Sequence, residues 1–287
     1  MLKSCAQSKA LATQPVCYIL KMDAQVTLVF VLTFVIHLIS MLAYAVRIAG
    51  VRTGRIAISF ALFNVLALVS RTSNTFQAPL LAKHVEENIL LGTGWSVERD
   101  LRYLVFAATL ATLVGLLLIP TFQRVFSKAI NRLETYRSVP KLLLRSFSRS
   151  GLREIRNAVS IPTTANITRL TLRGAPRAIL IYNALATALI TVGVFASLYA
   201  GFLRPELRVT ANNLSPVVNA LSTILLFVFI DPYLSLLTDD VTDGRATQAY
   251  FRRCIVLFGL SRLVGTLLAQ LFLAPAARLI AVVADLL

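Results

Sequence analysis

The chain has 287 residues, of which 57% are hydrophobic and only 15% are charged, with 29 Lys and Arg against 13 Asp and Glu. Charge this sparse excludes an ordinary soluble domain and indicates an integral membrane protein. The net charge of +16 is typical of Lys and Arg enrichment in cytoplasmic loops, so we expect no nucleic-acid partner. Three cysteines and two histidines form no disulfide or metal pattern, and we expect neither a metal nor a cofactor.

The N-terminal region precedes an apolar run that is too long for a cleaved signal peptide, so this run is interpreted as a retained anchor. Met22 stands directly before the run and is a candidate for the true start. Residues 1–21 are therefore treated as a doubtful N-terminal extension.

Six segments reach the length of about 20 apolar residues that crosses a hydrocarbon core of roughly 30 Å. The predicted fold class is therefore an all-α integral membrane protein with six transmembrane helices in one polytopic domain, residues 1–287. Residues 22–127 form a first three-helix half, residues 128–177 a basic cytoplasmic loop, and residues 178–287 a second three-helix half. The predicted spans are 24–46, 56–81, 101–122, 178–203, 211–237 and 254–274.

The two halves also show a weak internal repeat. One shift along the chain aligns, without a gap, Tyr44 with Tyr199, Asn64 with Asn219 and Pro120 with Pro275. Because three spans per half is an odd number, the repeats would have inverted topology, as in many secondary transporters.

The basic residues predict the orientation. The loops after spans one, three and five hold 18 Lys and Arg, whereas the opposite side holds nine, which places the N-terminus outside. In the third loop, Lys141, Arg145, Arg149 and Arg153 recur every four residues. This spacing predicts a basic amphipathic helix on the inner membrane surface, where it would contact anionic lipids.

Span two carries a donor-rich stripe in its outer half. Arg71 is followed by Asn74 and Gln77 at i+3 and i+6, and an arginine at this depth is expensive unless something compensates its charge. A guanidinium binds phosphate oxygens in a fork, and amide groups add neutral donors. The stripe suits a phosphate or pyrophosphate, while snorkelling of Arg71 toward the outer headgroups is the alternative.

The other ionisable groups within the spans are His37, Asp231 and Arg262. From their depths, Asp231 and Arg262 could meet in a structural ion pair. His37 is expected to bond to Asn64 or to a backbone carbonyl, and a proton relay is its alternative role. These four residues are candidates for coupling or structural roles.

An acidic cluster follows span five, formed by Asp239, Asp240 and Asp243 before Gly244. It could hold Mg²⁺ in a membrane enzyme that acts on polyprenyl phosphates, although no histidine or serine motif accompanies it. A solvated turn is the simpler interpretation.

Residues 44–83, YAVRIAGVRTGRIAISFALFNVLALVSRTSNTFQAPLLAK, resemble the Amj family, the alternative lipid II flippases of bacterial peptidoglycan synthesis. The similarity lies in the RIAGVRTGR turn and the SRTxN-x-x-QAP stretch. It implies transport of lipid II, the undecaprenyl-pyrophosphate-linked disaccharide pentapeptide, from the inner to the outer leaflet of the cytoplasmic membrane. The expected activity is transport and not enzymatic catalysis.

The resemblance suggests how the arginines act. At the cytoplasmic face the headgroup would be attracted by Arg47, Arg52 and Arg55, and in the outward-facing state the pyrophosphate would be held by Arg71, Asn74 and Gln77. Two alternatives stay open: a membrane enzyme acting on polyprenyl carriers, and a non-transporting scaffold of cell-wall synthesis. The energy source, and whether the chain forms a homo-oligomer, also stay open.

Overall fold

The computed structural model describes residues 2–91, 94–136, 148, 153, 156–160 and 174–287. Among these residues, six stretches of helix are long and apolar enough to cross a membrane, which confirms the prediction of six spans. The observed spans are Ala24–Thr53, Ile56–Leu90, Val97–Leu133, Arg177–Leu203, Pro205–Thr242 and Gln248–Leu286.

The helices extend beyond the predicted spans because the connections described between them are short. The first half contains α1 (Leu2–Thr53), α2 (Ile56–Leu91) and α3 (Gly94–Tyr136). The turn between α1 and α2 depends on Gly54, whose φ of 68° lies in the left-handed region that favours glycine. The second half contains α7 (Arg177–Leu203), η1 (Pro205–Leu207), α8 (Arg208–Asn213), α9 (Ser215–Ile224), η2 (Leu225–Ile230), α10 (Asp231–Thr242) and α11 (Gln248–Leu286).

The fifth span is a helix with a local distortion just before Asp231. Pro232 follows Asp231 and has no N–H, and its ring crowds the carbonyl one turn earlier. The helix widens here into the π-helical segment η2, and the Asp231 N–H donates to the Leu226 carbonyl five residues back. The distortion thus comes immediately before a carboxylate within a membrane span.

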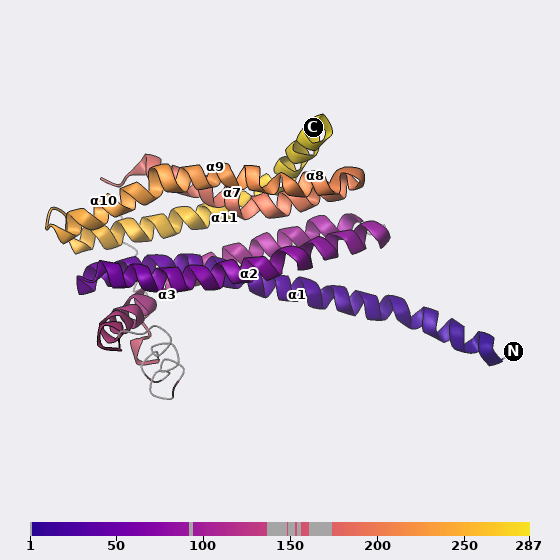
Figure 1. Cartoon of the computed structure of the whole chain (residues 1–287), viewed down its shortest axis with the longest axis horizontal. Coiled ribbons are helices and arrows are strands. Elements are labelled where there is room, and N and C mark those ends of the chain that lie inside the picture. Colours follow the sequence, from indigo (N-terminus) through magenta and orange to yellow (C-terminus); the bar gives the residue numbers. More distant parts are fainter. Residues whose placement is uncertain (1, 92–93, 137–147, 149–152, 154–155, 161–173) are drawn as a thin grey trace.

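The two halves form two layers, with α1, α2 and α3 in one and the helices from α7 to α11 in the other (Figure 1). In each layer the first helix packs extensively against both of its partners: α1 contacts α2 and α3, and α7 contacts α9 and α11. The same packing order in both layers is what a repeat would produce, while the inverted relation between them stays a prediction.

We call one end of the bundle the basic end. It comprises the α1–α2 turn, the C-terminal end of α3, the N-terminal end of α7 and the α10–α11 turn. The predicted basic helix in the third loop falls mostly outside the described residues and stays a prediction. The described part of this loop folds back onto α3, since Ser160 and Thr121 exchange hydrogen bonds of 3.0 and 3.1 Å through the hydroxyl of Thr121.

Small residues allow the helices to approach closely. Gly265 of α11 lies directly against the carbonyl of Ala184 and the side chain of Thr187 on α7, and Gly115 of α3 lies against Met41 of α1. A side chain at either glycine would overlap these atoms, as is typical of helix packing in membranes.

Candidate functional site

A partly buried ion pair joins the two halves near the basic end. Nη2 of Arg47 on α1 donates to Oδ1 of Asp231 on α10 over 3.0 Å, with side chains 16% and 40% exposed. The guanidinium also lies 6.0 Å from the ring centroid of Phe60 on α2. The predicted pair of Asp231 with Arg262 is therefore wrong: α10 packs near Arg47, and depth alone could not identify the neighbouring helix.

Arg262 and His37 each have a buried nitrogen that lacks a hydrogen-bond partner among the described residues. The Nε atom of Arg262 is buried, as is Nδ1 of His37, and neither forms a hydrogen bond with a described residue. The positive charge of Arg262 acts electrostatically on His37. The predicted contact between His37 and Asn64 is wrong, because Asn64 is exposed on α2 whereas His37 is buried.

The polar stripe of α2 is divided between two faces. Gln77 is buried, and its Nε2 donates to the hydroxyl of Thr33 on α1 over 3.0 Å. Arg71 and Asn74 are exposed, and the Arg71 guanidinium forms no hydrogen bond or ion pair with a described residue. Arg71 and Asn74 therefore lie on the surface, whereas Gln77 bonds α2 to α1.

The helical register shows which face of α2 carries Arg71. Phe60, Asn64 and Arg71 follow the spacing i, i+4 and i+11, so they lie within about 40° of one another around the helix. Phe60 is the residue against which Arg47 packs. Arg71 therefore lies on the side of α2 that bears the contact with Arg47, roughly 16 Å farther along the helix.

The remaining two predicted arginines lie at the basic end. Arg52 is exposed in the last turn of α1, and Arg55 follows Gly54 in the turn, where its N–H donates to the Gly50 carbonyl over 3.1 Å. Together with Arg47 they place three cations within nine residues of the chain.

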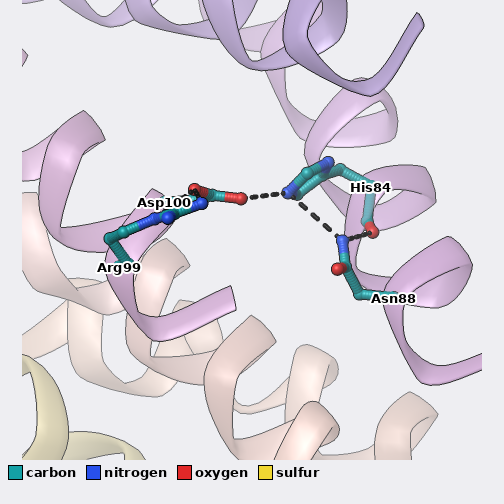
Figure 2. Close-up of polar contacts among 4 residues, drawn as sticks. All are labelled: His84, Asn88, Arg99 and Asp100. Atoms are coloured by element: carbon teal, nitrogen blue, oxygen red, sulfur yellow. Dashed lines mark hydrogen bonds and ion pairs between the residues drawn. The ribbon is translucent and has the colours of Figure 1, made fainter. Parts of the chain in front are cut away.

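A polar cluster that the sequence interpretation missed fastens α2 to α3 at the opposite end. Nε2 of His84 lies 3.1 Å from Oδ2 of Asp100, and Nδ2 of Asn88 lies 3.4 Å from the same ring nitrogen. Figure 2 shows Asp100 and Asn88 converging on His84 from two helices, with Arg99 beside Asp100. The i, i+4 spacing of His84 and Asn88, with an acid 16 residues after His84, was the available signal.

Further polar contacts join the two halves at this opposite end. The hydroxyl of Tyr199 on α7 donates to Oε2 of Glu98 on α3 over 2.7 Å. Arg102 of α3 donates to the Gln270 carbonyl of α11 over 3.0 Å, and Gln270 returns a bond of 2.9 Å to the Arg102 carbonyl. Both ends of the interface between the halves are thus closed by hydrogen bonds or ion pairs.

Two of the three carboxylates in the acidic cluster after span five are ion-paired within their own turn. Arg245 forms ion pairs of 2.9 Å with both Asp240 and Asp243 around Gly244, whose φ is 76°. In the described part of the chain, no group of three or more His, Cys, Asp or Glu side chains could hold a metal ion. The geometry favours the turn interpretation over a magnesium site.

An all-helical chain with six apolar spans, and with arginines both inside and on the surface of those spans, is a multi-pass membrane protein. The chain belongs to the Amj family, since the family model described as "Alternate to MurJ" matches residues 32–284. It is also 37% identical over 261 residues to the lipid II flippase Amj of Bacillus subtilis (strain 168), which covers 90% of this chain and 96% of that protein. No solved structure matches the chain. The resemblance noted at residues 44–83 is therefore confirmed at the level of the family.

Proposed function

We propose that this protein is a lipid II flippase of the bacterial cytoplasmic membrane, a transporter of a lipid-linked precursor and not an enzyme. The observation that carries this proposal is the similarity to the Bacillus subtilis flippase over nearly the whole length of both chains. The six apolar spans and the two layers joined by polar contacts support it, because moving a large headgroup between leaflets requires two halves that can rearrange.

The orientation proposed here has the basic end in the cytoplasm and the N-terminus outside. Arg52 and Arg55 at that end would attract the pyrophosphate of lipid II and the headgroups of other anionic lipids. Arg47 is already paired with Asp231, so an arriving pyrophosphate would compete with this carboxylate for the guanidinium. Exchange of one anion for another would loosen the link between α1 and α10.

Arg71 and Asn74 would hold the pyrophosphate in the outward-facing state. They are surrounded by exposed apolar side chains, with Leu68 65% and Phe76 62% exposed, so the Arg71 guanidinium lies at membrane depth without a described partner. A phosphate oxygen pair would accept two hydrogen bonds from it. Gln77 would add a donor only in a state in which it has left Thr33.

The test is rescue of bacterial cells depleted of their other lipid II flippase. Arg71→Ala is expected to abolish rescue at normal protein level, while Arg71→Lys retains part of it because the charge remains but the fork is lost. Lys83→Ala is the matched control, since it removes an exposed cation from the same helix, and it should rescue fully. Full rescue by Arg71→Ala would contradict the role of Arg71 and favour a scaffold that does not transport.

A further inference from the structure

Arg262 belongs to the interior stripe of α11. Phe258, Gly265 and Ala269, at i−4, i+3 and i+7 from it, are buried, so the Arg262 side chain leaves the helix on the side that packs against the rest of the molecule. Its Nε atom is buried and has no hydrogen-bond partner among the described residues. A guanidinium in such a place needs a compensating group, because desolvation of a charge is costly.

His37 lies at the same level on α1. Gly259 of α11 packs against the end of the Met41 side chain, which fixes the register between the two helices. The two helices run in opposite directions along the bundle (Figure 1). His37 precedes Met41 by four residues and Arg262 follows Gly259 by three, so both lie about one turn from the Met41–Gly259 contact, on the same side of it. His37 is only 8% exposed, and its Nδ1 atom has no partner.

Three carboxylates in or near the spans are paired with other cations. Asp231 pairs with Arg47, Glu98 pairs with Arg102, and Asp285 pairs with Arg204. In the part of the chain that the structure describes, Arg262 forms no ion pair. A partly buried guanidinium at the level of a buried imidazole, each with a buried nitrogen that has no described partner, matches the oxygen acceptors of a phosphoryl group.

We propose that Arg262 and His37 form an anion site at mid-depth, between α1 of the first half and α11 of the second, which binds one phosphoryl group of a lipid pyrophosphate. This inference rests on the proposed function and adds an interior position between the arginines of the basic end and Arg71. The guanidinium supplies the charge and a planar fork, and His37 supplies an N–H when Nδ1 carries the proton. Because the site draws one residue from each half, an occupied site would tie the halves together.

The experiment measures thermal unfolding of the purified full-length protein in detergent, with added undecaprenyl pyrophosphate, undecaprenol or inorganic pyrophosphate. The variants are Arg262→Gln and His37→Ala, and the matched control is Arg278→Gln, an exposed arginine of the same helix. The lipid pyrophosphate should raise the Tm of the wild type and of the control, whereas undecaprenol should not. Each site variant should lose about tenfold or more in affinity for the lipid pyrophosphate.

The ligand-free Tm separates a binding role from a structural one. Arg262→Gln removes a charge that nothing compensates, so its Tm without ligand should equal or exceed that of the wild type. A lower ligand-free Tm together with unchanged affinity would overturn the inference and show that Arg262 supports the fold. If Arg262→Gln cannot be purified folded, His37→Ala decides, and binding within twofold of the wild type overturns the proposal.

Three further outcomes identify the source of the anion and separate this inference from the proposed function. Equal affinity for inorganic pyrophosphate and for the lipid would overturn the assignment of a lipid ligand. Unchanged binding in both site variants, with wild-type rescue of depleted cells intact, would overturn this inference and leave the flippase proposal standing. Absence of both binding and rescue in the wild type would instead contradict the flippase proposal.

Discussion

Close glycine contacts are concentrated within each half, beside polar pairs such as Gln77 with Thr33, whereas the ends of the interface between the halves are joined by polar contacts. Within a half, backbones meet through glycine, as where Gly265 of α11 lies against Ala184 of α7. Between the halves, Gly259 does pack against Leu116 and Met41, yet both ends of the interface are joined by polar contacts such as Arg47 with Asp231. Tight packing has few alternative arrangements, whereas polar contacts can exchange partners, so each half is suited to move as a unit.

Two arginines at the interface between the halves differ in whether they have a partner. Arg47 has a carboxylate partner at 3.0 Å, while Arg262 has a buried Nε without one. The first arrangement holds the halves together in the absence of ligand. The unpaired Nε of Arg262 leaves a donor for an anion at mid-depth, and a transporter that moves a pyrophosphate across the membrane needs such a donor there.

Disrupting the packing within a half should cause the largest loss of stability. Gly265→Leu would insert a side chain where α7 and α11 touch, and it should destabilise the protein by about 3 kcal/mol or more, or prevent folding. The loss of folded protein is measured by size-exclusion chromatography and thermal unfolding. Val264→Leu, at an exposed neighbouring position, should leave the folded yield unchanged, and an equal loss in both variants would contradict this packing argument.

The ion pair between the halves should give an intermediate effect. Asp231→Ala leaves Arg47 partly buried and unpaired, and since Asp231 is 40% exposed we expect a loss of only about 1 to 2 kcal/mol. Replacing Arg47 as well, in Asp231→Ala/Arg47→Met, should recover most of that loss. A double-mutant cycle on the free energy of unfolding measures the coupling, and strictly additive single effects would show that the pair does not join the halves.

A part-buried hydrogen bond from an uncharged hydroxyl to the Glu98 carboxylate, at the opposite end, should give the smallest effect. Tyr199→Phe removes the donor of the 2.7 Å bond to Glu98 and should cost about 1 kcal/mol. Tyr103→Phe is the control, since Tyr103 is exposed and stacks on Phe30 with its ring. The two variants are compared by thermal unfolding, and an effect of Tyr199→Phe no larger than the control would remove this contact from the account.

Much of the fold could be predicted because apolar length and loop charge are local properties of the sequence. The six spans needed no knowledge of which helix packs against which. Predicting the partner of Asp231 did require knowing which helices pack against each other. Span five continues through a π-helical segment to Thr242. There α10 contacts both α1 and α11, but the Asp231 carboxylate pairs with Arg47 of α1, which no estimate of depth could reveal.

The candidate site was predictable only in part, for the same reason. The arginine and amides of span two were visible as a stripe, but their division between two faces depends on how α2 packs on α1 through Gln77 and Thr33. Asn183 of α7 was not predicted, although it is the one amide side chain in the fourth span, and its Nδ2 donates to the Ser261 hydroxyl over 2.6 Å. The orientation and the headgroup contacts stay predictions.

The central claim is tested most directly by lipid II exposure in liposomes that contain the purified protein. Labelled lipid II in the inner leaflet should become accessible to a membrane-impermeant reagent outside at a rate that depends on protein, in wild type and in Lys83→Ala. Arg71→Ala at equal protein content should fall to the rate of empty liposomes. A wild-type rate no faster than that of empty liposomes would contradict the account.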